Sequence, residues 1–574
     1  MDKRFFLAIL LTGGVVLLTP VLFPRPTAPV PATVTDSTAA NAPTAPSAAT
    51  QAASVAPAST PASVAPMTPA AAAPAVVAAP SVPTAPIETL TVTNSVTTFA
   101  ISTQGARLVG AELPRFQRLG ADTGLVRLGH GRGALVQYTI LAGGDTIPLA
   151  GLVFTASRDA GSTGETLRFD APVGGGNVRI SYTLTPDNYV TTVRVEASGL
   201  PQPAFLLTQL PTGFDSQEAD PKEDANHLAY AFKPVVGGAD RIDFRKPDPG
   251  ERMIESGPFT WAVAKNKYFL VGVLTPEGQQ SALAELQVTG AVRENKIATR
   301  AQGVLVSPLA DAPLAFELYA GPQEWERLVG MGREFEKTNP YGGWISGVVQ
   351  PFATIVMRLL LWLKKTTALE YGWILVGFGV AIRLMMWPLN SRMMRTQLEM
   401  QRIAPLVQEA QNKHKGDPEK QRLAVMKVYQ EHNVSPFAAL SGCLPMLLPM
   451  PILIALFFVF QNTIEFRGVS FLWLSDISLK DPFYILPLAM GVSMYALSWL
   501  GMRNVPPNPQ TKMMSVLMPI MMTVLLLNFA SGLNLYYTVQ NLAALPQQWL
   551  ISNERGKAAK ATAVASGGGN ARKR

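Results

Sequence analysis

One arginine within an otherwise apolar segment is the feature of this sequence that most suggests chemistry. Arg383 lies ten residues after Trp373 and six before Leu389, and that segment holds no other charge. An arginine near the middle of a bilayer costs about 2.5–3.5 kcal/mol on insertion scales. Two environments are open for it. The side chain either snorkels toward the interface beside Asn390, or faces a water-containing cavity between helices.

A row of polar side chains in the last apolar segment is the second such feature. It consists of Asn534, Tyr537, Thr538 and Asn541, which fall at i, i+3, i+4 and i+7 and therefore share one helix face. Such rows commonly form hydrogen bonds between membrane helices. Together with Arg383, the row would instead line a shared polar groove. No Asp or Glu occurs in any expected span, so we expect water or a visiting acidic group beside the arginine.

Other kinds of chemistry find little support. The single cysteine, Cys443, excludes an internal disulfide framework and a thiol-rich zinc site. The four histidines are scattered, and we find no phosphate-binding loop or zinc-protease motif. We therefore expect no catalytic residue, no metal and no cofactor.

Composition indicates a membrane protein. The chain has 574 residues with a net charge of +8, yet only 15% of residues are charged and 48% are hydrophobic. Soluble domains carry about 25% charged residues. A basic excess in so apolar a chain favours the cytoplasmic face of a lipid bilayer as a partner, and we expect no binding to DNA.

The amino-terminal region divides into an anchor and a linker. Residues 1–23 place Lys3 and Arg4 before an uncharged run, Phe5–Phe23, that is long enough to cross a bilayer. A cleaved signal peptide is the alternative, but its apolar region is usually shorter. Residues 24–87 consist almost entirely of Ala, Pro, Thr, Ser and Val, which predicts a disordered spacer.

Residues 88–335 show the alternation of β-strands. Val178, Ile180, Tyr182 and Leu184 alternate with polar residues, a turn follows at 186–188, and the alternation resumes, as in a hairpin. Many such short strands predict an all-β sandwich. Because one inside-to-outside span precedes it, we expect this domain outside the cytoplasm.

A bundle of apolar segments makes up the rest of the chain. Residues 340–365 have the spacing of an amphipathic helix, and their charges favour an interfacial position over a span. A core of five spans is expected within 366–552. Its apolar segments are Trp373–Leu389, Phe437–Asn462, Phe483–Met502 and a helical hairpin over Met513–Asn553.

Charge distribution sets the expected topology. Residues 390–436 carry eight Lys/Arg and are expected to form two antiparallel helices that project from the membrane, with a break at 412–418. The tail, residues 553–574, is also basic. The loop 463–482, in contrast, has only two basic residues, Arg467 and Lys480. Six spans with both termini in the cytoplasm satisfy the positive-inside rule.

Five segments resemble a known family, the YidC membrane protein insertases of bacteria. They are NPYGGWISGVV (339–349), ILVGFGVAIRLMMWPL (374–389), VSPFAALSGCLPMLLPMPILIAL (434–456), FLWLSDISLKDPFYILPLAMG (471–491) and SGLNLYYTVQNL (531–542). The resemblance covers about 340–552, and the outer domain is similar to the family's periplasmic β-supersandwich.

The resemblance implies a multi-pass protein of the bacterial inner membrane with a groove open to the cytoplasm and to lipid. Arg383 matches the family's groove arginine, and Tyr537 and Asn541 lie on the span that lines the groove. The family inserts nascent membrane proteins, alone or with the SecYEG translocon, and assists their folding. It receives chains from the ribosome, for which the hairpin 390–436 and the basic tail are the expected contacts.

Two other functions remain open at this stage. A secondary transporter also has broken helices and a central polar site, but the spans show no inverted repeat and no carboxylate. An enzyme acting on sugars would need acid–base groups in the outer domain, where His130 and His227 form no recognisable motif.

Overall fold

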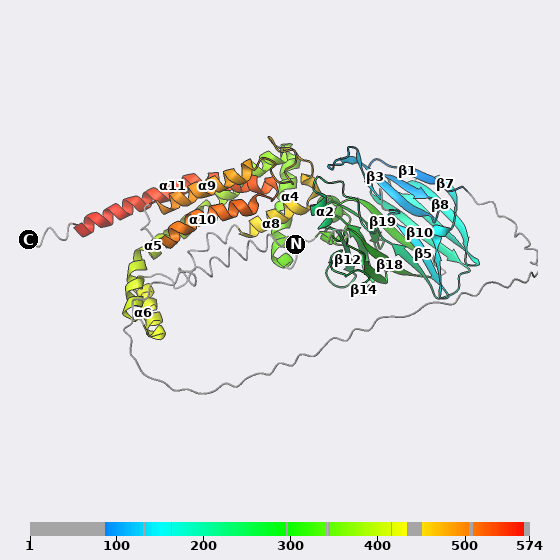
Figure 1. Ribbon diagram of the computed structural model, residues 1–574, viewed down its shortest axis with the longest axis horizontal. Helices are drawn as coiled ribbons and strands as arrows, with labels where there is room; N and C mark the ends of the chain where they lie inside the picture. The colour runs from blue at the N-terminus through cyan, green and yellow to red at the C-terminus, as the bar shows by residue number, and fades with distance from the viewer. Residues whose placement is uncertain are drawn as a thin grey trace, which may run out of the picture. The chain divides into compact units, whose positions relative to one another are not determined.

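The computed structural model describes residues 86–567, except for 130–132, 162–163, 294–296, 311, 340, 343–344, 415, 433–449 and 504–508. The expected anchor, nearly all of the linker, the first half of the span at 437–462 and the last seven residues of the tail lie outside this description. Within it, the strands precede the long helices along the chain (Figure 1).

The β domain contains three antiparallel sheets. The nine-stranded sheet has the order β13 (Asp240–Asp243), β12 (Ala229–Pro234), β15 (Phe259–Lys265), β16 (Phe269–Leu274), β19 (Leu314–Pro322), β10 (Val190–Ser198), β9 (Gly176–Leu184), β8 (Gly164–Val173), β7 (Thr155–Gly161). The six-stranded sheet has the order β14 (Arg252–Ser256), β17 (Glu285–Gly290), β18 (Ala301–Leu309), β11 (Ala204–Gln209), β5 (Gln137–Ala142), β6 (Asp145–Pro148). The four-stranded sheet has the order β1 (Thr89–Thr93), β2 (Thr98–Ser102), β3 (Arg107–Gln117), β4 (Leu125–Leu128).

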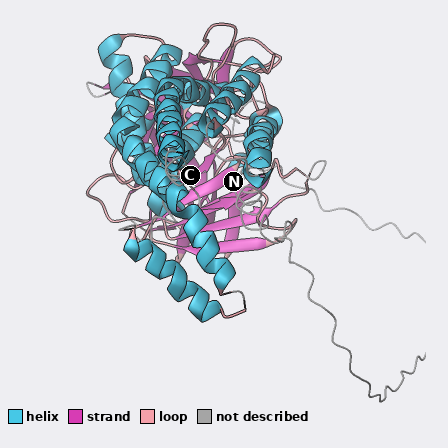
Figure 2. Ribbon diagram, turned by 90° about the vertical axis from the view of Figure 1, so that its left-hand side faces the viewer, coloured by secondary structure: helices cyan, strands magenta, loops and turns pink. Residues whose placement is uncertain are grey.

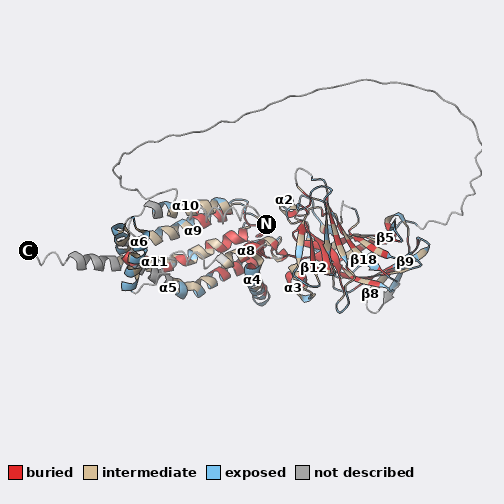
Figure 3. Ribbon diagram, turned by 90° about the horizontal axis from the view of Figure 1, so that it is seen from below, coloured by how far each residue is buried: buried red, intermediate tan, exposed pale blue. Residues whose placement is uncertain are grey.

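The two larger sheets pack face to face around a common core. The hydroxyl of Tyr182 on β9 donates to the hydroxyl of Tyr138 on β5 at 3.0 Å. Tyr230 on β12 likewise reaches the Ala301 carbonyl at the start of β18, at 2.9 Å. These side chains cross between the sheets and are fully buried, so the expected sandwich is present, with its buried residues concentrated in the strands (Figure 3).

The hairpin predicted from alternation is confirmed. β9 and β10 pair antiparallel, with Leu184 opposite Thr191 and Ile180 opposite Val195. The apolar members of β9, Val178, Ile180 and Tyr182, are fully buried. The two-residue period therefore identified the buried face correctly, because successive strand residues point to opposite sides of a sheet.

The long helices follow the β domain along the chain, and Figure 2 distinguishes helices from strands by colour. The long ones are α4 (Ser346–Thr367), α5 (Tyr371–Lys413), α6 (Pro418–Glu431), α8 (Met450–Asn462), α9 (Ile485–Met502), α10 (Pro509–Leu526) and α11 (Ser531–Gly567). The short ones are α2 (Pro221–Ala225), α3 (Trp325–Gly330) and the 3₁₀ turns η1 (Leu149–Gly151), η2 (Phe335–Thr338) and η5 (Ile464–Phe466). α11 packs against both α9 and α5, α10 packs against α9, and α4 packs against α8.

Three helices in the described residues are long and apolar enough to cross a membrane. They are Ser346–Thr367, Tyr371–Ser391 and Ile485–Met502, and the shorter apolar helices are Pro451–Asn462 and Lys512–Leu526. α4 thus has the length of a span as well as the spacing of an interfacial helix, and its interfacial position stays a prediction. α11 is not among the three, because asparagine and glutamine side chains interrupt its apolar residues.

Two helix boundaries correspond to expected breaks, and one expected boundary is missing. α5 ends at Lys413 and α6 begins at Pro418, where Asp417 caps the helix by accepting from the Lys420 amide. α10 and α11 are separated at 527–530, within the helical hairpin expected over Met513–Asn553. In contrast, the expected span Trp373–Leu389 and the first hairpin helix form one continuous helix, α5.

Candidate functional site

Arg383 lies at the contact between α5 and α11. Its Nη2 donates to Oε1 of Gln547 at 3.0 Å. The Gln547 Nε2 donates in turn to the Trp387 carbonyl at 3.1 Å and to the Ser391 hydroxyl at 3.0 Å. Gln547 is 2% exposed, whereas Arg383 is half-buried, and the Arg383 Nε has no hydrogen-bond partner among the described residues.

The direction of the Arg383 side chain bears on the two alternatives for it. Gln547 bonds both to the guanidinium and to the next two turns of α5, so the guanidinium lies toward the end of the span at which Asn390 stands. Snorkelling would give this direction. The guanidinium nevertheless remains at a helix contact and is bonded to an amide rather than to a carboxylate.

A second hydrogen bond joins α5 and α11 nearer their amino-terminal ends. The Gln540 Nε2 donates to the Gly379 carbonyl at 3.1 Å and to the Tyr536 hydroxyl at 3.0 Å. A Cβ on Gly379 would lie 3.1 Å from Val539 Cγ1, so glycine permits the close approach of the two helices. We call the set Gly379, Arg383, Ser391, Gln540 and Gln547 the α5–α11 seam.

Most of the predicted polar row faces α9 instead. Thr538 Oγ1 is 3.5 Å from the Leu486 carbonyl, and Asn541 Nδ2 donates to Ser493 Oγ at 3.2 Å. Asn534 is fully buried and donates to the Leu526 carbonyl at the end of α10 at 3.1 Å. The structure thus places Arg383 of α5 against α11, the helix that carries this row, but at a different face of that helix.

Tyr537 completes the predicted set. It is half-buried, and its ring centroid lies 6.2 Å from that of Tyr536. The Tyr536 ring in turn packs on Phe378 of α5, with centroids 5.9 Å apart. Tyr536, the neighbour of Tyr537 in the chain, is therefore the tyrosine that packs on α5 and accepts from Gln540 of the α5–α11 seam.

Sequence reasoning missed Gln540 and Gln547. Both fall on the helix that carries the polar row, and both bond to α5. The signal available was their spacing of seven residues, two helical turns, which places them on one face. The sequence does not show how α11 is aligned against α5, and so it could not show that this face meets α5.

The loop 463–482 joins the helices to the β domain. Its Arg467 makes two hydrogen bonds to Glu218, at 3.0 and 2.8 Å, and the two side chains are 4% and 6% exposed. The guanidinium also lies over the rings of Tyr268 and Phe269. Trp325 of α3 donates its backbone N–H to Glu465 at 2.9 Å. Buried ionic and polar contacts therefore hold this loop.

Glu465 is the most perturbed carboxyl of this loop. Burial raises its pKa to about 7 from an ordinary 4.5, although two backbone N–H groups oppose the shift. Its Oε2 has no hydrogen-bond partner among the described residues. The side chain borders a cavity of about 540 Å³, lined also by Glu324, Glu326, Arg327, Leu361, Lys364, Lys365 and Tyr371.

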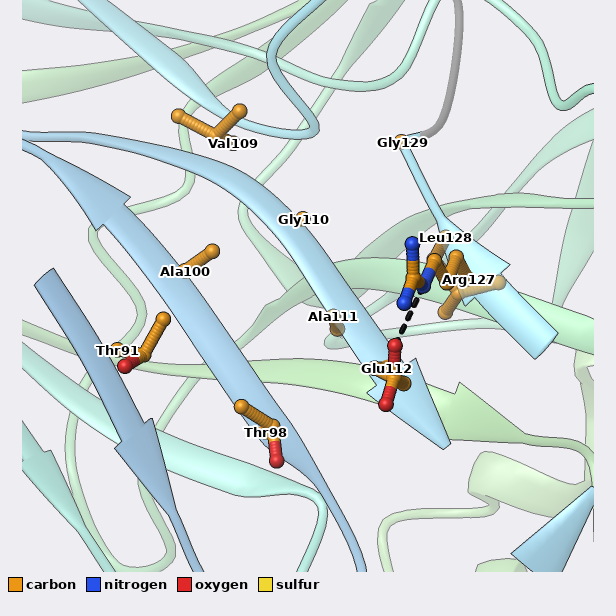
Figure 4. A pocket seen from close by; sticks show the side chains of 10 residues that line it. All are labelled: Thr91, Thr98, Ala100, Val109, Gly110, Ala111, Glu112, Arg127, Leu128 and Gly129. Carbon is orange, nitrogen blue, oxygen red and sulfur yellow. Dashed lines mark hydrogen bonds and ion pairs between the residues drawn. The ribbon is translucent and has the colours of Figure 1, made fainter. Parts of the chain in front are cut away.

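An open cavity of about 320 Å³ lies on the four-stranded sheet (Figure 4). Its lining is mostly small or apolar, and its charged members, Glu112 and Arg127, are paired with each other. No group of three or more His, Cys, Asp or Glu suited to a metal occurs in the part of the chain that the structure describes.

Comparison with known proteins identifies both halves of the chain. Residues 89–355 match the family model described as YidC periplasmic domain, and residues 362–558 match the model described as 60Kd inner membrane protein. A membrane protein insertase YidC of Anaeromyxobacter sp. (strain Fw109-5) is 31% identical over 389 residues, which cover 66% of this chain and 67% of that protein.

A second sequence relative agrees with this match. A membrane protein insertase YidC of Ralstonia nicotianae is 31% identical over 441 residues, covering 74% of this chain and 76% of the relative. A crystal structure of an active YidC insertase, with its first transmembrane domain resolved, covers 81% of this chain and 94% of its own at 19% identity. Its TM-score is 0.33, so the assignment rests on the sequence relatives.

The two family models place a periplasmic domain before a multi-pass inner-membrane region, in the order that the strands and helices have here. The relatives are insertases and not enzymes. The chain belongs to the YidC family of membrane protein insertases.

Proposed function

We propose that this protein moves nascent transmembrane segments and short polar tails into the inner membrane through a hydrated groove open to the cytoplasm. The observation that carries the proposal is the Arg383 guanidinium, held between two apolar helices by an amide and without a carboxylate in any span. A charge so placed needs water or a visiting acidic group, because an unsolvated cation in hydrocarbon is costly.

Such a groove would shorten the stretch of hydrocarbon that the polar tail of a substrate must cross without water. A polar tail that crosses hydrocarbon leaves backbone groups unpaired, at several kcal/mol each. Water around Arg383 would solvate the tail part of the way. The apolar segment of the substrate would then move sideways into lipid, where burial of apolar surface supplies the driving force.

The five predicted site residues take different parts in this proposal. Arg383 keeps the groove wet and attracts acidic tails, and Tyr537 lines the groove beside it. Asn534, Thr538 and Asn541 hold α11 against α9 and α10 through the hydrogen bonds described above, and so keep the wall of the groove in place.

The partners of this activity are nascent membrane proteins and the surrounding lipid. We propose that the insertase works alone or with the SecYEG translocon, and also assists the folding of membrane proteins. The hairpin 390–436 and the tail 553–574 would contact the ribosome, since both are basic. Both termini would lie in the cytoplasm.

Insertion into proteoliposomes tests the proposal. The substrate is a small membrane protein with a short acidic tail, and insertion is followed by protection of the tail from external protease. We expect Arg383→Ala to retain activity, since water alone can solvate a tail, and Arg383→Glu to lose about tenfold through repulsion of the acidic tail. Equal insertion by wild type, Arg383→Glu and protein-free liposomes would exclude the mechanism.

A further inference from the structure

The orientation of Arg383 depends on one buried amide. Gln547 is 2% exposed, and its Nε2 is fixed by two acceptors on α5, the Trp387 carbonyl and the Ser391 hydroxyl. An amide whose nitrogen donates to two groups on one helix must turn its oxygen the other way. That oxygen, Oε1, is the atom that accepts from Arg383 Nη2 at 3.0 Å.

Among the described residues, this arrangement gives the guanidinium one hydrogen-bond acceptor. An arginine has five N–H donors in a planar fork, and the contact with Gln547 uses one of them. The Arg383 Nε has no hydrogen-bond partner in the described residues. Because a neutral amide accepts the one bond, the guanidinium is held in place while its positive charge stays uncompensated.

We propose that Gln547 is the positioning residue of the groove arginine and sets the preference of the insertase for acidic over neutral substrate tails. The inference rests on the proposed function. Gln547 meets the substrate only through Arg383. Its neutral oxygen holds the cation, whereas a carboxylate at the same place would hold it equally well and cancel its charge.

Two variants distinguish the effect of positioning the Arg383 guanidinium from the effect of compensating its charge. In Gln547→Glu a carboxylate faces Arg383 and forms an ion pair, which removes the attraction for an acidic tail. In Gln547→Met the acceptor is lost and the volume is nearly kept, so Arg383 keeps its charge and loses its fixed position. Gln548→Glu is the matched control, because Gln548 faces α9, where a Cβ on Gly501 would lie 2.8 Å from its Nε2.

The measurement is a ratio of insertion rates in proteoliposomes, for one substrate carrying either an acidic or an uncharged tail of equal length. We expect Gln547→Glu to lower this ratio to the value of Arg383→Ala, about threefold below wild type, while insertion of the uncharged tail is kept. Gln547→Met should lower it by less than Gln547→Glu, because Arg383 keeps its charge, and Gln548→Glu should leave it at the wild-type value. A merely structural role would slow both substrates alike and leave the ratio unchanged.

A double variant tests whether Gln547 acts through Arg383. In an Arg383→Ala background, the uncharged replacement Gln547→Met should have no further effect on the ratio. An unchanged ratio in Gln547→Glu, or an equal effect of Gln547→Met with and without Arg383, would overturn the inference. If wild type itself inserts no better than protein-free liposomes, the proposed function fails instead, and the two failures are thereby distinguished.

Discussion

Asn534 shows how one buried amide stabilises the helical bundle. It is fully buried on α11, and its side chain satisfies the Leu526 carbonyl at the end of α10. Carbonyls at a helix end have no partner within the helix. The Asn534 side chain therefore fixes the turn between two helices that share a short connection.

Replacing this amide should loosen the turn. We expect Asn534→Ala to reduce stability by about 1 kcal/mol, since interhelical hydrogen bonds in membranes have about this value. Thermal unfolding in detergent measures the change. Leu542→Ala serves as the comparison on the same helix, because Leu542 is 50% exposed. A larger loss in Leu542→Ala than in Asn534→Ala would contradict the role given to the amide.

The buried carboxyl of Glu465 makes stability depend on pH. Its pKa is about 7 in the folded protein and 4.5 ordinarily, so the folded state binds the proton more tightly than the unfolded chain. The resulting contribution to the free energy of unfolding is complete at pH values below the ordinary pKa of 4.5. It is lost as the pH rises through 4.5 toward 7, because the ionised form is disfavoured by burial.

We expect Glu465→Gln to remove this dependence. The variant should unfold at a higher temperature than wild type at about pH 8, and at a similar temperature at about pH 4. Glu326→Gln is the comparison, since Glu326 borders the same cavity but is exposed and paired with Lys365, and it should have a smaller effect because it acts only through its charge near Glu465. A wild-type advantage at the higher pH would show that Glu465 is stabilised as a carboxylate.

At the scale of elements, the loop 463–482 connects the membrane helices to the β domain through a buried ion pair. Removing one partner of a buried pair costs about 3–5 kcal/mol, because the other charge is left without compensation. The Arg467–Glu218 pair is almost fully buried, and the Arg467 Nε–H is shared between the two Glu218 carboxylate oxygens. We therefore expect Arg467→Leu to be strongly destabilising.

Double replacement provides the test. Arg467→Leu should raise the rate of proteolysis in the loop, and adding Glu218→Leu should restore part of the protection by removing the orphaned carboxylate. The exposed pair of Lys365 with Glu326 is the comparison, and Lys365→Ala should cost less than about 1 kcal/mol. Equal effects of Arg467→Leu and Lys365→Ala would refute the importance of burial.

The elements also show where sequence patterns succeed. Strand alternation identified β9 and β10, and Gly416 and Pro418 marked the break between α5 and α6. The continuous helix α5 was not foreseen, because an apolar span and a polar hairpin helix differ in composition although the backbone needs no break between them. α5 even continues through Pro388, where one backbone hydrogen bond is missing.

At the scale of the whole molecule, the proposed groove should be accessible to water from the cytoplasm and closed to water from the periplasm. A single cysteine at position 383, in a Cys443→Ser background, should react with a membrane-impermeant maleimide added from the cytoplasm and not from the periplasm. A cysteine at the neighbouring Leu384 is the control. Leu384 is 60% exposed on the protein surface and would face lipid, so we expect no labelling from either side.

The outcome of this labelling separates three arrangements. Labelling of position 383 from both sides would indicate a pore through the membrane, and labelling from neither side would indicate a dry helix contact. Either result would contradict the hydrated groove. Labelling at both 383 and 384 from the cytoplasm would place the whole segment in water instead of in the membrane.

The sequence by itself determined the order of the parts, because strand and helix periods and the lengths of apolar segments are local properties. It also determined that Arg383 has no acidic partner in any span, since composition alone excludes one. It could not determine which residue holds the arginine. Gln547 is 164 residues away, and its bond to Arg383 depends on the depth and rotation of α11 against α5. Only tertiary packing sets these, since a helical period shows which residues share a face but not which face meets a neighbour.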